Sequence, residues 1–125
     1  MGTQLRGIRG ATVAADNSRE AILSATSDLL QRLIAENKLQ IQDIASIFFS
    51  VTPDLDAEFP AVAARQMGME TVPLLCLNEI PVRGSLPRCV RILIHANLTW
   101  AQKEVRHVYL GEAARLRPDI VGYAS

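Results

Sequence analysis

The sequence predicts one α+β domain, in which a mixed five-stranded sheet is accompanied by two main helices. Two observations predict this: the chain has 125 residues, the size of one ordinary domain, and short apolar runs of strand length alternate with two stretches of helical periodicity. Apolar residues make up 49% of the chain, which is enough to fill an interior. We expect residues 1–125 to form a single domain that ends in a loose tail at residues 119–125.

The first expected strand is Leu5–Val13, which mixes β-branched residues with glycine. Glycine inside a strand marks a bulge or a close approach of two backbones, and Gly7 and Gly10 are candidates for such a role. After this strand, Asn17 and Glu20 resemble a capping box that would start a helix. Apolar residues then recur at helical spacing, and the stripe comprises Ile22, Leu23, Thr26, Leu29, Leu30, Leu33 and Ile34, with Asn37 as the expected end.

The middle of the chain predicts two strands and a short helix. The dense apolar run Ile44–Val51 is typical of a strand covered on both faces. Phe59–Met67 has a short helical pattern, in which Pro60 suits the first turn and Gly68 suits the C-terminal cap. Val72–Leu77 is the next expected strand.

The last third predicts a loop at Pro81–Pro87 and a strand at Arg88–Ala96, whose alternation gives Arg91 apolar neighbours on one face. A further strand is expected at Val105–Leu110, and Ala113–Arg117 could continue it. Five strands and two helices together make the α+β class.

The charge balance argues against nucleic acid and membranes as partners. Lys plus Arg and Asp plus Glu number 13 each, so no field of one sign surrounds the protein. No apolar run approaches the roughly 20 residues of a membrane span, and Met1–Arg9 lacks the apolar segment of a signal peptide. We therefore expect a soluble, cytoplasmic protein.

Cysteine and histidine offer little independent chemistry. Cys76 and Cys89 lie in apolar stretches without the spacing of a metal or redox motif, so both are expected to be reduced thiols. His95 and His107 fit packed or interface positions better than acid or base roles.

Three strings along the chain carry a resemblance. They are Arg6–Thr12, Thr52–Leu55 with Phe59–Ala61, and Arg106–Leu110 with Leu116–Asp119. Together, and in this order, they resemble the trimeric, barrel-forming class of chorismate mutases (the AroH class), and the similarity extends over nearly the whole chain. The resemblance implies a homotrimer whose sheets pack into a pseudo-β-barrel core with the helices outside, one active site at each subunit boundary, and no metal or cofactor.

The implied reaction is the rearrangement of chorismate to prephenate in phenylalanine and tyrosine biosynthesis. An ether C–O bond breaks while a C–C bond forms in the same molecule, so neither a proton transfer nor a nucleophile is required. A protein can assist by restraining the substrate in a compact conformation and by supplying positive charge where the ether oxygen becomes electron-rich.

The resemblance assigns the ether-oxygen contact to Arg91, whose planar fork can also hold a carboxylate oxygen. It assigns to Glu79 the substrate's ring hydroxyl and the orientation of Arg91. The residues alone favour ordinary roles, in which Arg91 is a structural arginine paired at an interface and Glu79 is an exposed loop carboxylate.

Further site residues follow from the same resemblance. Arg9 and Tyr109 would hold the carboxylate of the enolpyruvyl side chain, and Cys76 would lie near the ring hydroxyl. The rest of the rim would come from Phe59 and Arg65 of the neighbouring subunit and from the C-terminal segment with Leu116 and Arg117, which would order over the ligand. Without the resemblance, each of these residues has an ordinary reading as a core residue or a solvated charge.

Two positions depart from the family pattern. Val62 stands where members can carry a lysine near the pocket entrance, and Leu75 stands where a small hydroxyl residue can precede the cysteine. We expect the change at Val62 to affect KM more than the chemical step. Two alternatives to the mutase stay open: a trimeric regulatory protein that binds a small carboxylate, and an imine deaminase on a similar trimer.

Overall fold

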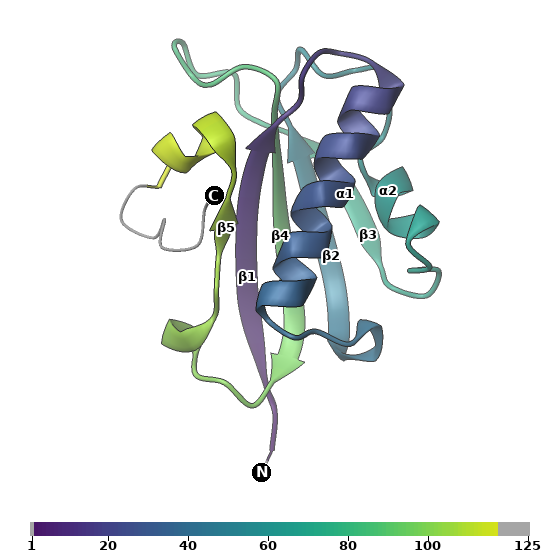
Figure 1. Ribbon diagram of the computed structural model, residues 1–125, viewed down its shortest axis with the longest axis vertical. Helices are drawn as coiled ribbons and strands as arrows, with labels where there is room; N and C mark the ends of the chain where they lie inside the picture. Colours follow the sequence, from purple (N-terminus) through teal and green to yellow (C-terminus); the bar gives the residue numbers. More distant parts are fainter. Residues whose placement is uncertain (1, 118–125) are drawn as a thin grey trace.

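A five-stranded mixed sheet forms the framework of the protein, and both α-helices pack on the same face of it (Figure 1). The computed structural model describes residues 2–117, so the tail expected at residues 119–125 lies outside the described residues. The strand order is β3-β2-β4-β1-β5, with parallel pairing at both edges and antiparallel pairing in the centre. The strands are β1 (Gln4–Val13), β2 (Ile44–Val51), β3 (Leu74–Asn78), β4 (Cys89–Leu98) and β5 (Val108–Tyr109). The α+β class and the mixed sheet are therefore confirmed.

Helix α1 (Arg19–Glu36) begins one residue later than the sequence indicates. Ser18 is the N-cap, and its hydroxyl accepts a hydrogen bond from the Ala21 N–H at 3.1 Å. The prediction of Asn17 as the cap is wrong, because the Asn17 amide instead accepts the backbone N–H groups of Asp56 and Ala57. The expected end at Asn37 is confirmed.

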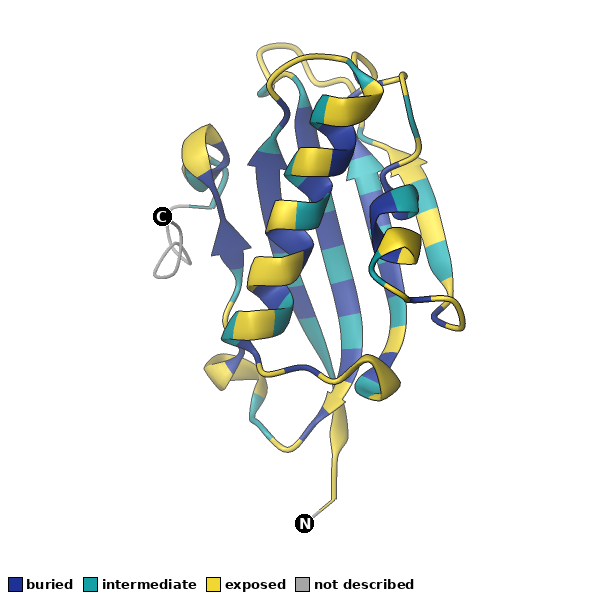
Figure 2. Cartoon of the chain, turned by 45° about the vertical axis from the view of Figure 1, so that its right-hand side comes forward, coloured by how far each residue is buried: buried dark blue, intermediate teal, exposed yellow. Residues whose placement is uncertain are grey.

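The core lies between the sheet and the two helices. Side chains of the strands alternate, and Figure 2 shows the buried stripe of α1 turned toward the sheet. Helix α2 (Ala61–Gln66) is confirmed near its expected position, and Gly68, with φ of +92°, lies just beyond its end. The core on this side includes Ile8, Leu29, Leu33, Ile47, Phe49, Ile92 and Ile94.

The opposite side of the sheet, here called the open face, carries Arg9, Phe48, Ser50, Arg91 and Leu93, all of which are half-buried. Among residues 2–117, neither α-helix packs on it. The expectation that β2 is covered on both faces is therefore not met within one chain. A face of this composition is available to a second protein surface.

The chain after β5 departs from the expected strand. Strand β5 pairs with β1 over two residues, and a 3₁₀ turn (Gly111–Arg115) follows, so Ala113–Arg117 does not continue the strand as the sequence would have allowed. Gly111 adopts φ of +56°, which turns the chain across the sheet. Ala113 then packs in a buried cluster with Ala11, Cys89 and Tyr109, so the segment covers one end of the open face.

Within residues 2–117 no helix combines the length and the apolar character required to cross a membrane.

Candidate active site

Four of the residues expected at the site line one groove on the open face. These residues, Arg9, Glu79, Arg91 and Tyr109, surround a groove of about 610 Å³. Three of them come from adjacent strands, since the register pairs Ala11 with both Arg91 and Tyr109 and places Arg9 two residues before Ala11. Glu79 follows β3, where its N–H donates to the Val51 carbonyl at 2.8 Å. The groove is thus built on rigid strand backbone.

Arg91 and Glu79 form an incomplete ion pair in the groove. Arg91 Nε lies 3.4 Å from Glu79 Oε1, and the two side chains are 39% and 26% exposed. The Nε atom itself is buried, and no atom of the described residues accepts a hydrogen bond from it. A buried N–H of a cation without an acceptor is costly, so this group is well suited to an oxygen atom of a ligand.

Ser50 is a groove residue that the sequence reasoning missed. Its hydroxyl donates a hydrogen bond to Glu79 Oε2, and it lines the groove together with Phe48 and Leu93. The available signal was its position: a polar residue within an apolar strand, on the face away from the core.

The C-terminal segment approaches the same pair. A small pocket of about 70 Å³ lies beside the groove and is lined by Leu116, Glu79, Arg91, Cys89 and Thr52. Burial raises the pKa of the Cys89 thiol, although the positive charge of Arg91 opposes this effect. The thiol therefore stays protonated near neutral pH, and it is unsuited to nucleophilic work.

Tyr109 lines the groove, whereas Arg117 lines neither the groove nor the small pocket beside it. Tyr109 is 2% exposed and packs with the C-terminal turn. Arg117 is half-buried, and its charge, together with that of Arg9 and the larger effect of burial, lowers the pKa of His107. The backbone N–H of Arg9 donates to His107 Nδ1 at 3.1 Å, which holds the imidazole beside the strand that carries Arg9.

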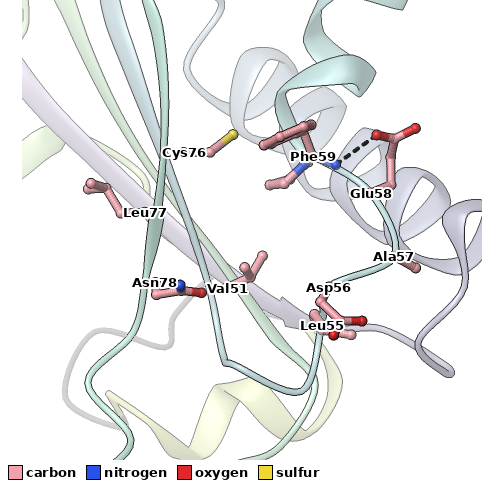
Figure 3. A pocket seen from close by; sticks show the side chains of 10 residues that line it. Val51, Leu55, Asp56, Ala57, Glu58, Phe59, Cys76, Leu77 and Asn78 are labelled. Atoms are coloured by element: carbon pink, nitrogen blue, oxygen red, sulfur yellow. Dashed lines mark hydrogen bonds between the residues drawn. The ribbon is translucent and has the colours of Figure 1, made fainter.

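Cys76 and Phe59 line a different pocket, on the helix side of the sheet edge. This pocket of about 360 Å³ is shown in Figure 3, where Cys76 projects from β3 toward the segment that carries Phe59. Phe59 is 67% exposed. Glu58 fixes this segment, since its carboxylate accepts the Phe59 N–H at 2.9 Å and pairs with Arg19 at 2.8 Å, and these contacts lower the pKa of Glu58.

Strand β3 separates the two pockets. Cys76 packs against the helix-side core, whereas its neighbours Leu75 and Leu77 project to the open face. Leu77 and Asn78 line both pockets. The structure therefore does not bring Cys76 and Phe59 into contact with Arg91 within one chain, and Arg65, exposed on α2, lines neither pocket.

The groove has the chemistry of an anion site. Two arginines, one carboxylate and a tyrosine face a surface with a large apolar share from Phe48, Leu93 and Ile80. Such a site can hold a small molecule that bears carboxylates and a hydroxyl. Within residues 2–117 no three side chains of the His, Cys, Asp or Glu types gather as metal ligands would.

Comparisons with known proteins agree on one family. The family model described as chorismate mutase type I matches residues 5–120. A protein named chorismate mutase AroH from Thermus thermophilus is 50% identical over 117 residues, which cover 93% of this chain and 96% of that protein. The protein of the same name from Bacillus subtilis (strain 168) is 41% identical over 117 residues, covering 93% and 92%.

A solved structure gives the same result for the fold. The structure of a chorismate mutase from Clostridium thermocellum superposes with a TM-score of 0.86 at 47% sequence identity. The alignment covers 87% of this chain and 97% of that chain. The likeness thus extends over both the sheet and the helices.

Proposed function

The chain belongs to the type I chorismate mutase family, and from this premise we propose that it converts chorismate to prephenate in the open-face groove. The observation that carries the proposal is the buried Nε–H of Arg91, which has no acceptor among residues 2–117. Chorismate is a dianion that carries a hydroxyl and an ether oxygen, and the ether oxygen gains electron density as its C–O bond breaks. A fixed guanidinium beside that oxygen stabilises the transition state more than the ground state.

Each groove residue has one role in this rearrangement. Arg91 donates to the ether oxygen, and Glu79 accepts the ring hydroxyl while it orients the guanidinium. Arg9 and Tyr109 hold the carboxylate of the enolpyruvyl side chain, which keeps the bonding carbons close. The apolar walls exclude water and so strengthen each charged contact.

We further propose that the complete site lies between subunits of a homotrimer with a pseudo-β-barrel core. One subunit would contribute the groove, and its neighbour would contribute Cys76, Phe59 and Arg65. Two observations support this. Strand β3 separates the two pockets within one chain, and large apolar side chains are exposed nearby: Phe59 in the segment before α2, and Ile80 (80% exposed) and Val82 in the loop after β3. Apolar side chains in such number at one edge mark an interaction surface.

Leu116 and Arg117 would cap the ligand from the C-terminal side, in keeping with the small pocket that Leu116 shares with Arg91. We also propose that the enzyme works in the cytoplasm, in phenylalanine and tyrosine biosynthesis.

A direct assay tests the activity. Purified protein is added to chorismate, the fall of its ultraviolet absorbance is followed, and acid treatment then converts prephenate to phenylpyruvate for detection. A folded protein that binds chorismate without turnover would point instead to a carboxylate-binding protein.

Arg91→Ala tests the mechanism. We expect kcat to fall by at least about 10²- to 10³-fold, as for loss of one donor that stabilises developing charge. Arg32→Ala is the matched control, because Arg32 is exposed on α1, on the other side of the sheet. Equal rates for Arg91→Ala and Arg32→Ala would show that Arg91 does not stabilise the transition state.

A further inference from the structure

We propose that Ser50 is a positioning residue that engages one carboxylate oxygen of Glu79, so that Glu79 orients Arg91 through its other oxygen and the Nε–H of Arg91 stays available to the substrate. The inference rests on the proposed mutase function and adds a residue that no part of the mechanism above requires. Three neighbouring groups on the open face are involved: the Ser50 hydroxyl, the Glu79 carboxylate and the Arg91 guanidinium.

Ser50 lies on β2, between β4, which carries Arg91, and β3, which Glu79 directly follows. Its register partners are Arg91 on β4 and Leu77 on β3, so all three side chains project to the open face. Its hydroxyl donates to Glu79 Oε2, while Glu79 Oε1 is the oxygen nearest to Arg91. The backbone of Glu79 is anchored to Val51, the residue after Ser50. The carboxylate therefore has a fixed base and one committed oxygen.

The ion pair would be different without this hydrogen bond. A free carboxylate beside a guanidinium prefers a bidentate arrangement, in which both oxygens accept N–H groups. In the structure Oε2 is engaged by Ser50, the remaining approach is 3.4 Å, and Arg91 Nε has no acceptor among the described residues. Ser50 thus prevents Glu79 from occupying the donor that the ether oxygen needs.

Removal of the hydroxyl should affect both substrate binding and the chemical step. In Ser50→Ala, Glu79 is free to close on Arg91, so we expect kcat/KM to fall by about tenfold or more, the usual size of a lost hydrogen bond to a charged group. Most of the loss should be in kcat, because the contact to the ether oxygen strengthens in the transition state. Ser50→Thr keeps the hydroxyl and should restore activity to within about threefold of the wild type.

Ser46→Ala is the matched control. Ser46 lies on the same strand and the same face, but it contacts His95 Nδ1 at 3.3 Å and lines no part of the groove. We expect its kcat and KM to stay within about twofold of the wild type, since the small change in packing is the same as in Ser50→Ala.

A double-mutant cycle separates positioning from a general structural role. In the Glu79→Gln background, Ser50→Ala should change kcat/KM by less than about twofold, since the carboxylate through which Ser50 acts is already gone. An undiminished effect of Ser50→Ala in that background would overturn the proposal, as would a Ser50→Ala enzyme that matches the wild type. In both cases the wild type still turns over chorismate and the mutase function stands. A wild-type protein without turnover would remove the function and the role of Ser50 together.

Discussion

At the residue scale, Arg91 combines a loss in stability with a proposed role in catalysis. Its position on β4 is set by backbone pairing on both sides, and its Nε atom is buried although the side chain as a whole is 39% exposed. Glu79 neutralises the charge without satisfying the Nε–H. Buried donors without an acceptor lower stability and are typical of functional sites, where a ligand can supply the missing acceptor.

His107 binds the backbone of Arg9, a groove residue, and it makes the stability of the fold depend on pH. Its Nδ1 accepts the backbone N–H of Arg9, which requires that nitrogen to be unprotonated. Burial, and then the charges of Arg9 and Arg117, lower its pKa below the ordinary value of 6.5. The imidazole of His107 is therefore protonated at a lower pH in the folded protein than in the unfolded chain.

The sign of the pH effect follows from this difference. As pH falls through about 6.5, the unfolded chain binds a proton first, so the free energy of unfolding decreases until the folded-state pKa is reached. His107→Asn, which keeps an acceptor for Arg9, should reduce this loss between about pH 7.5 and 5.5 by up to roughly 1 kcal/mol per pH unit. Urea unfolding at fixed protein concentration measures it, and parallel pH curves for the two proteins would contradict the prediction.

At the scale of elements, the pairing of β1 with β5 depends on a missing side chain. A Cβ at Gly10 would lie 2.4 Å from the Val108 carbonyl oxygen and 3.0 Å from a methyl carbon of Leu29. The close approach expected for a glycine in this strand is confirmed at Gly10. Because Tyr109 follows Val108, the same contact fixes one wall of the groove.

Gly10→Ala should therefore destabilise the fold and weaken the site together. We expect a loss of about 1–3 kcal/mol in the free energy of unfolding, as for other overpacked positions, and a lower kcat/KM. Gly7→Ala is the control on the same strand, since its Cβ would meet Leu93 at an ordinary 3.9 Å. Urea denaturation compares the two, and equal stabilities would show that β5 shifts without cost.

Helix α1 illustrates how neighbouring polar residues divide their roles. Ser18 caps the helix, while Asn17 holds the loop at Asp56 and Ala57 through backbone N–H groups. The same loop leads to Glu58 and Phe59, so the start of α1 also supports the helix-side pocket.

At the scale of the whole molecule, the α-helices cover one face of the sheet and the groove lies on the other. This arrangement leaves the groove face available for contact with a second subunit. The groove and the helix-side pocket lie on opposite faces of the sheet near the β3 edge. A second subunit that places its helix-side pocket against the groove of the first would complete the rim of the site. A closed ring of three subunits satisfies this with identical contacts.

Subunit mixing tests the shared site. Arg65→Ala and Arg91→Ala proteins, each nearly inactive, are mixed and allowed to exchange subunits. If the two arginines meet across a boundary, random mixing restores about one quarter of the sites. Each site needs Arg91 from one subunit and Arg65 from its neighbour, and each of these is intact in half of the subunits. Sedimentation should show a trimer before and after mixing. Activity that stays at the level of the separate variants, after exchange is verified by a mass-tagged subunit, would exclude a shared site.

The class of the fold and most of its elements can be predicted from the sequence, because hydrophobic periodicity reflects burial directly. The strand at Ile44–Val51 and the helix end at Asn37 are confirmed as expected. The sequence did not predict the cap, because Asn17 binds the distant loop at Asp56 and Ala57 and Ser18 caps the helix instead. It also did not predict the turn that the positive φ of Gly111 makes after β5.

Tertiary structure alone decided how the expected site residues divide. The sequence could name Arg91, Glu79 and Cys76, but it could not separate Cys76 from the other two. That separation follows from strand register, since adjacent residues of β3 project to opposite faces. The hydrogen bond of Ser50 to Glu79 joins residues 29 positions apart, and no local pattern contains it. Chain folding brings the groups of the groove within reach of one another, and their geometry decides which donor remains for a ligand.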